Sequence, residues 1–153
     1  MHKPYFKNED GQPKSLYCKV KRTVRFEEVD LLQVVWHGRY VSYFEDARVA
    51  LGEKYGIGYL TLSSNEILTP IKTLHVDYRL SLQFQEEFTI EAILHWSEAS
   101  RINMEYIIRN SDNEITSTGF TIQMMLDIDF NLYILQPPFF KDFCDRWKAG
   151  KFE

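Results

Sequence analysis

The chain has 153 residues, of which 44% are hydrophobic and 26% charged, a composition typical of a single globular domain. Its formal net charge of -4 argues against a nucleic-acid partner, because such proteins neutralise phosphates with clustered Lys and Arg side chains. Cys18 and Cys144 lie far apart and outside any metal-binding spacing, so we expect neither a disulfide framework nor a metal site.

The first residues give no targeting signal. They lack the apolar centre of a signal peptide, and no uninterrupted apolar run of about 18 residues follows, so we expect a cytoplasmic protein without membrane association. Residues 1–16 are polar and contain Pro4, Gly11 and Pro13, which predicts a flexible lead-in. From Tyr17 apolar and polar residues alternate up to Phe26, which predicts a first strand.

One long helix is expected next. Residues at spacings of three and four form one mostly apolar face of this helix: Tyr40, Val41, Phe44, Ala47, Arg48, Leu51 and Tyr55. The helix should run from about Gly38 to Lys54, and Gly56 can close it in a left-handed conformation. Glu45 and Arg48 lie close to one turn apart and should pair with each other or with neighbouring residues, a structural role.

After the helix, alternation returns four times, in segments joined by short polar links that favour consecutive antiparallel strands. The apolar faces are Leu74, Val76, Tyr78 and Leu80; Phe88, Ile90, Ala92, Leu94 and Trp96; Ile102, Met104, Tyr106 and Ile108; and Phe120, Ile122, Met124 and Leu126. Strands this long must twist and curl. We therefore predict an α+β fold in which a curved antiparallel sheet of about five strands wraps one long central helix, with a flat sheet as the alternative.

The remaining residues form a tail on the same domain. Residues 17–134 should make the domain, and residues 135–153 should add a helix with Phe140, Phe143 and Trp147 on one face. That helix either packs over an open face of the sheet or gates a ligand slot.

A family resemblance rests on the stretch that leads into the helix. The spacing of Asp30, Val34-Val35-Trp36-His37, Tyr40, Tyr43-Phe44-Glu45 and Ala47-Arg48 resembles the opening motif of hotdog-fold acyl-CoA thioesterases of the 4-hydroxybenzoyl-CoA thioesterase family. The likeness covers about residues 18–127. Leu31-Leu32-Gln33 depart from it, because the family commonly has small residues there. The resemblance implies the hotdog arrangement that the strand pattern also predicts.

The resemblance also implies an activity, which is hydrolysis of an acyl or aroyl thioester to the free acid and CoA without a cofactor. Asp30 would act as general base or nucleophile, and His37 and the helix N-terminal N–H groups near it would orient and polarise the carbonyl. Gly38 and Tyr40 would bind substrate, although Tyr40 is also placed for helix packing. From the residues alone, Asp30 could equally be a turn or capping carboxylate.

Ser100 and Arg101 lie at a strand link that resembles the place where family members often contact the nucleotide end of coenzyme A. The alternative is that these two residues belong to a solvated hairpin. An acyl carrier protein thioesterase and a non-catalytic acyl-CoA binding protein on the same fold remain alternative functions. Long edge strands expose unpaired backbone groups, so we expect a homodimer or homotetramer with its active site between subunits.

Overall fold

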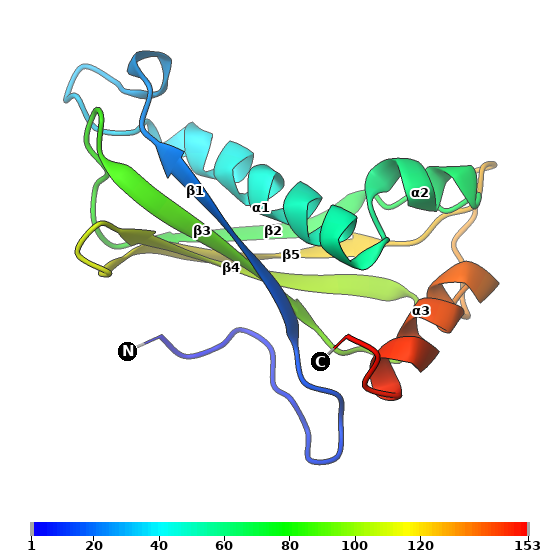
Figure 1. Ribbon diagram of the computed structural model, residues 1–153. Coiled ribbons are helices and arrows are strands. Elements are labelled where there is room, and N and C mark those ends of the chain that lie inside the picture. The colour runs from blue at the N-terminus through cyan, green and yellow to red at the C-terminus, as the bar shows by residue number, and fades with distance from the viewer. Residues whose placement is uncertain (1, 153) are drawn as a thin grey trace.

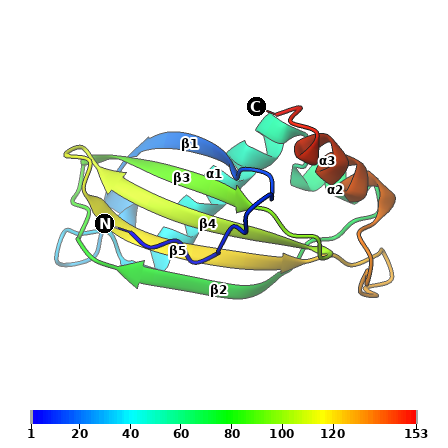
Figure 2. The same ribbon diagram turned by 90° about the horizontal axis from the view of Figure 1, so that it is seen from below.

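The computed structural model describes residues 2–152, so the first residue of the predicted lead-in and the last residue of the predicted tail lie outside it. A single antiparallel sheet with the strand order β1-β3-β4-β5-β2 carries one long helix, α1, across one face (Figures 1 and 2). The strands are β1 (Leu16–Thr23), β2 (Ile71–Tyr78), β3 (Glu87–His95), β4 (Arg101–Asn110) and β5 (Ile115–Met124); the helices are α1 (Tyr40–Tyr55), α2 (Tyr59–Ser64) and α3 (Pro138–Lys148), with 3-10 turns η1 (Phe26–Glu28) and η2 (His37–Arg39). The predicted fold is confirmed.

Helix α1 begins two residues later than predicted. Gly38 lies in the 3-10 turn η2, where a Cβ atom would come within 2.3 Å of the Trp36 ring. The α-helix proper starts only at Tyr40. Its end is as expected, because Gly56 adopts a left-handed φ of 74° and its N–H donates to the Gly52 carbonyl.

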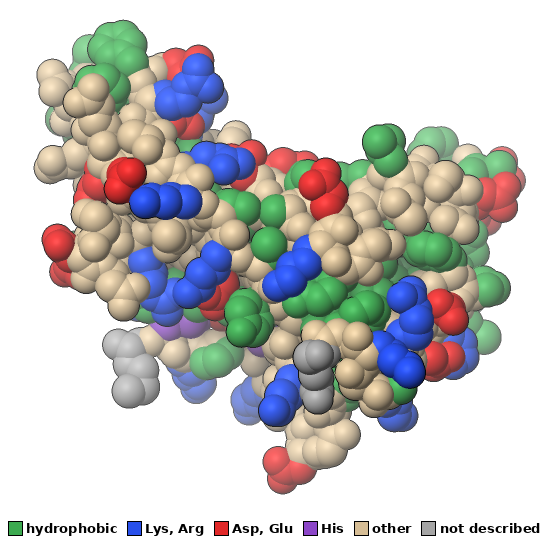
Figure 3. Space-filling view, viewed as in Figure 1, with side chains coloured by type: hydrophobic (Ala, Val, Ile, Leu, Met, Phe, Trp, Pro, Cys, Tyr) green, Lys and Arg blue, Asp and Glu red, His purple; other side chains and the backbone are tan. Residues whose placement is uncertain are grey.

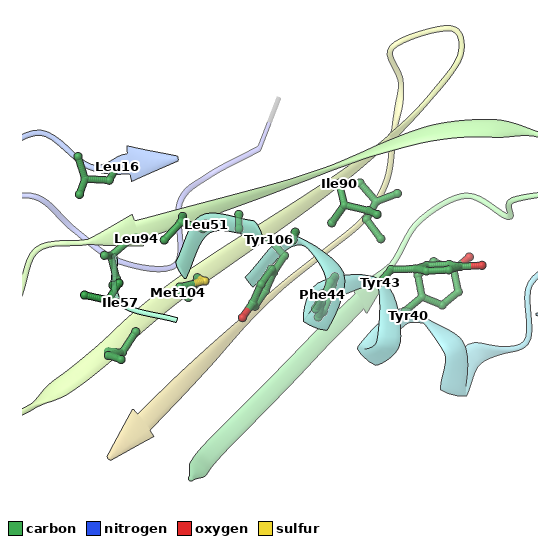
Figure 4. Close-up of a cluster of buried hydrophobic side chains, with 14 of the residues drawn as sticks. Leu16, Tyr40, Tyr43, Phe44, Leu51, Ile57, Ile90, Leu94, Met104 and Tyr106 are labelled. Atoms are coloured by element: carbon green, nitrogen blue, oxygen red, sulfur yellow. The ribbon is translucent and has the colours of Figure 1, made fainter. Parts of the chain in front are cut away.

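The core lies between α1 and the sheet (Figure 4). Phe44, Ala47 and Leu51 are fully buried on the helix face that was predicted to be apolar. The ring of Phe44 stacks on that of Tyr106, with 4.4 Å between centroids and 7° between planes. These two aromatic rings therefore pack together at the centre of the molecule.

Strand β5 turns its apolar side chains away from the helix. Its period of two was predicted correctly, but Phe120 points to the outer face of the sheet while Gly119 pairs with Tyr106 on the helix side. A Cβ atom on Gly119 would lie 2.3 Å from the His75 carbonyl oxygen and 2.6 Å from the Phe44 ring. The helix approaches so closely here that only a bare backbone fits below it.

The predicted apolar face of β2 is largely uncovered. Strand β2 lies at one edge of the sheet, pairing only with β5 among the described residues. Leu74, Tyr78 and Leu80 are 44%, 51% and 45% exposed. An open edge with exposed apolar side chains is a surface on which another strand can pair.

Residues 2–15 cross the outer face of the sheet (Figure 2). The Tyr5 and Thr118 hydroxyls lie 2.7 Å apart, and the Phe6 ring packs edge-on against Phe120. Helix α3 holds the end of this segment, because Trp147 Nε1 donates to the Lys14 carbonyl at 2.8 Å. The sequence predicted a flexible lead-in, and these contacts were not foreseen.

Helix α3 takes a packing position, which is one of the two alternatives that the sequence left open. Phe140, Phe143 and Trp147 are buried on its inner face, and the Trp147 ring meets that of Trp96 edge-on with 5.0 Å between centroids. These contacts support the packing role over that of a gate.

Candidate active site

Asp30 opens a tight turn between η1 and η2. Its N–H donates to the Val34 carbonyl at 3.0 Å, and its own carbonyl accepts from Gln33 N–H at 2.9 Å. Gln33 has a φ of 61°, the left-handed conformation that closes such turns. The turn places Leu31 and Leu32 at its tip, 103% and 79% exposed, and Figure 3 shows hydrophobic atoms on the projecting corner of the molecule that carries this loop.

The Asp30 carboxylate has a local hydrogen bond within this turn. Its Oδ1 atom accepts from the Leu32 backbone N–H at 2.8 Å. This bond fits the turn-carboxylate alternative, but it uses one carboxylate oxygen and fixes the direction of the other. Asp30 is half-buried in the single chain. A carboxylate held in this way is oriented and still reachable by a small molecule.

The turn η2 brings His37 and Gly38 to the N-terminal end of α1. The indole of Trp36 covers Gly38 and lies 5.0 Å from the His37 ring, measured between centroids. Arg39 N–H donates to the Trp36 carbonyl at 2.9 Å, so it is not one of the free donors expected at the helix start. His37 itself is exposed. The predicted set of carbonyl-polarising groups thus reduces to the N–H groups at His37 and Gly38.

Tyr40 is buried in the helix packing and also lines a cavity. It is 3% exposed and packs edge-to-face on Tyr78 at 5.1 Å, and Tyr78 OH donates to the His37 carbonyl at 2.7 Å. Tyr40 also lines a cavity of about 260 Å³ together with Val35 and His37. Burial raises the pKa of the Tyr40 phenol, so it stays a neutral hydrogen-bonding group.

Ser100 and Arg101 lie at the opposite end of the sheet (Figure 2). Arg101 begins β4, whose ten residues separate it from the Asp30 end by roughly 30 Å at ~3.3 Å per residue. Ser100 is buried, and Arg101 Nε donates to Asn103 Oδ1 at 2.9 Å. One chain therefore gathers Asp30, His37, Gly38 and Tyr40 at one end and leaves the candidate nucleotide contacts at the other.

A second polar cluster, around Arg48, was only partly foreseen. Arg48 pairs with Glu45, as predicted, and also donates to the Tyr59 hydroxyl at 2.6 Å and the Tyr106 hydroxyl at 3.1 Å. Burial alone would lower the pKa of Arg48, but its interactions with Tyr106, Tyr59 and Glu45 outweigh burial and raise it. The sequence spacing identified the helical pair, whereas Tyr59 and Tyr106 come from other elements.

The outer face holds a buried carboxylate. Glu105 is 1% exposed and is bound by His95 Nε2 at 2.7 Å and by His2. Its hydrogen bonds do not amount to a metal site, since no group of three or more His, Cys, Asp or Glu side chains within residues 2–152 could hold an ion. In the same part of the chain, no helix has the length and apolar character needed to cross a membrane.

One long helix held against a curved five-stranded antiparallel sheet is the hotdog fold, and comparisons with known proteins agree. The family model of the thioesterase-like superfamily matches residues 24–147. The chain belongs to this family and is a thioester hydrolase.

Three relatives illustrate the likeness. The Bacillus subtilis (strain 168) protein named "Putative acyl-CoA thioesterase YneP" is 22% identical over 104 residues, 68% of this chain and 75% of that one. The DHNA-CoA thioesterase structure from Staphylococcus aureus is 26% identical with a TM-score of 0.76, covering 88% of this chain and 93% of that one. A second S. aureus structure, the hypothetical protein SAV2348 in complex with CoA, is 15% identical with a TM-score of 0.76, covering 89% and 86% of the two chains. At family level the family model, the B. subtilis relative and the DHNA-CoA thioesterase structure support acyl-CoA thioesterase activity, whereas the CoA-bound structure, at 15% identity, shows the shared fold alone.

Proposed function

We propose that this protein hydrolyses an acyl or aroyl thioester of CoA, with Asp30 as the catalytic carboxylate. The observation that carries the proposal is the placement of an oriented, half-buried carboxylate at the same end of the sheet as the start of α1, in a chain of the thioesterase-like superfamily. A thioester needs a base or nucleophile at its carbonyl carbon and hydrogen-bond donors at its carbonyl oxygen. Asp30 supplies the first, and His37 with Gly38 the second.

In the proposed reaction, the free oxygen of Asp30 accepts a proton from water while the water oxygen attacks the thioester carbon. Backbone N–H groups at His37 and Gly38 stabilise the negative charge that grows on the carbonyl oxygen. The carbon–sulfur bond then breaks, and the CoA thiol leaves with a proton. Direct attack by Asp30, giving a mixed anhydride, is the alternative that this geometry also permits.

The proposed active unit is a dimer formed along β2. Tyr78 ends β2 near His37, whereas Ile71 begins the strand at the end where Arg101 lies. Antiparallel pairing of two β2 strands would therefore bring the Ser100–Arg101 end of one subunit toward the Asp30 end of the other. A cation there could contact a CoA phosphate, which the single chain cannot arrange for its own Asp30. A fully active monomer in sedimentation analysis would contradict this assembly.

A thiol-release assay tests the proposed activity. Short, long and aromatic acyl-CoAs should be compared with the matching acyl-pantetheine and acyl carrier protein thioesters. We expect release from at least one acyl-CoA at a kcat/KM of about 10⁴ M⁻¹s⁻¹ or more, the usual range for an enzyme on its substrate. Release from carrier protein thioesters alone would assign the carrier protein as partner. Tight binding of all thioesters without release would show a binding protein.

A further inference from the structure

A cavity of about 400 Å³ lies at the β1 side of the molecule, on the opposite edge of the sheet from β2. It opens where the start of β1, the C-terminal end of α1 and helix α3 come together (Figures 1 and 2). Its volume lies within the range of about 300–1,000 Å³ typical of small-molecule sites. None of the candidate active-site residues lines it, so it is a separate place on the molecule.

Four aromatic rings form most of the apolar lining, and three of them are held in place. Trp147 is 5% exposed, and its Nε1 donates to the Lys14 carbonyl at 2.8 Å. The rings of Tyr55 and Phe152 meet edge-on, with 5.6 Å between centroids. Tyr17, the fourth, is 58% exposed and lies at the open side. Rings in such an arrangement offer flat apolar surface to another ring.

Two lysines supply the charge of the cavity. Lys54 Nζ donates to the Tyr17 carbonyl at 3.0 Å and lies 5.6 Å and 5.1 Å from the ring centroids of Tyr17 and Tyr55. Lys14 is the second lysine of the lining. Within residues 2–152 neither ammonium pairs with a carboxylate, and no Asp or Glu lines the cavity. Both lysines therefore have N–H groups to offer a ligand.

The charges select the kind of ligand. An ammonium group only donates hydrogen bonds, so it favours an anion, and the two lysines together repel the cations that aromatic rings otherwise attract. The helix ends at this cavity are the C-terminal ends of α1 and α3. Their partial negative charge opposes a phosphate dianion more strongly than a singly charged carboxylate. The ligand that fits is therefore a flat aromatic ring that carries one carboxylate.

We propose that this cavity binds a planar aromatic carboxylate at a site separate from the candidate active site. Its carboxylate would contact the ammonium groups of Lys14 and Lys54, and its ring would lie against Trp147 and Phe152. The proposal does not depend on the proposed hydrolysis. An acid of this class is also what an aroyl thioesterase releases, so the site would hold product away from Asp30.

A titration with 2-naphthoate and with its uncharged analogue 2-naphthamide tests the proposal on the full chain. The indole N–H signals of Trp147 and Trp36 are followed by NMR, because Trp147 lines the cavity and Trp36 lies beside His37. We expect 2-naphthoate to shift the Trp147 signal to saturation. It should bind about three- to tenfold more tightly than 2-naphthamide, close to the value of one hydrogen bond in a site open to water.

The double variant Lys14→Gln/Lys54→Gln should remove this preference. The matched control is Lys19→Gln/Lys21→Gln, which loses the same charge from exposed lysines that pair with glutamates on β3, and it should keep the preference. Taking the ratio of the two ligands within one variant cancels any general loss of affinity. Equal binding of both ligands by the wild type, an unchanged ratio in the Lys14/Lys54 variant, or a shift of the Trp36 signal alone overturns the proposal.

Discussion

Asp30 and Asp127 occupy the same position in two turns of the same kind. The Asp30 N–H donates to the carbonyl four residues on at 3.0 Å, and the Asp127 N–H does so at 2.9 Å. Oδ1 of each accepts a backbone N–H two residues on, at 2.8 Å for Asp30 and 2.9 Å for Asp127. A carboxylate in such a turn therefore needs no catalytic role, and Asp127 provides a control for Asp30 that shares its local structure.

The close approach of α1 to β5 predicts that Gly119→Ala destabilises the fold. The new methyl group would overlap the His75 carbonyl and the Phe44 ring, and the backbone oxygen cannot move without disturbing the ladder. We expect a loss of about 2 kcal/mol or more in the free energy of unfolding, measured with urea. Gly58→Ala is the control, because its added methyl meets nothing closer than 3.8 Å and should cost under about 1 kcal/mol.

The buried pair of Glu105 and His95 predicts a pH-dependent contribution to stability. Burial alone would raise the pKa of Glu105, but hydrogen bonds from His95 and His2 outweigh it and hold the pKa below the ordinary 4.5. A depressed pKa stabilises the fold at pH values above 4.5, and this contribution is lost as the pH falls through the folded-state value.

Glu105→Gln should accordingly lower the Tm at pH 7, and the difference from wild type should shrink steadily below pH 4.5. Glu87→Gln removes an exposed carboxylate paired with Lys21, and it should change the Tm little at either pH. A Glu105→Gln difference that stays constant from pH 7 to pH 3 would contradict the lowered pKa of Glu105.

Arg48 should contribute more to stability than an ordinary helical ion pair. Arg48→Met keeps the apolar stem but leaves the buried Tyr106 hydroxyl without its charged donor, so we expect a loss of about 2 kcal/mol or more. Arg146→Met removes an exposed pair with Asp142 on α3 and should cost under about 1 kcal/mol. Urea unfolding of both variants gives the comparison, and equal losses would show that the cluster adds nothing.

Arg101→Ala tests the predicted nucleotide contact. It should raise KM for the acyl-CoA but not for an acyl-pantetheine that lacks the nucleotide. Only the acyl-CoA has nucleotide phosphates that the Arg101 side chain could contact. Arg109→Ala, at the other end of β4, should leave both KM values unchanged. Equal increases for both substrates after Arg101→Ala would assign Arg101 to folding instead.

The elements that repeat a period over many residues were predictable from the sequence. Helix α1 and strand β3 could be predicted because the residues on their buried faces are apolar and recur at the period of a helix or a strand. The cap at Gly56 could be predicted because glycine readily adopts the left-handed conformation that ends a helix. The direction of β5 was not predictable, because alternation shows two faces without saying which one meets the helix. That choice depends on Phe44 needing the bare backbone of Gly119, a contact between distant parts of the chain.

The candidate site was predictable to a similar extent. Asp30, His37 and Tyr40 were predicted as site residues from spacing and resemblance; the structure places them at one end of the sheet, and their roles stay predictions. The sequence did not reveal the hydrogen bonds of Tyr59 with Arg48 and of Gln123 with the Thr69 carbonyl, because these join distant parts of the chain. It also did not reveal that the Arg39 N–H donates to the Trp36 carbonyl. The same holds for residues 2–15, whose polar sequence gave no sign of their packing on the sheet.

The central claim is that Asp30 is the catalytic carboxylate, and comparing thiol release by Asp30→Asn and Asp127→Asn tests it most directly. Asn keeps the shape and the Oδ1 acceptor of each turn but cannot serve as base or nucleophile, so both variants should melt close to wild type. We predict that Asp30→Asn lowers kcat on the best acyl-CoA by roughly 10²-fold or more, the scale of a lost general base, while Asp127→Asn does not. Hydrolysis by Asp30→Asn within about threefold of wild type would contradict the claim and make Asp30, like Asp127, a turn residue.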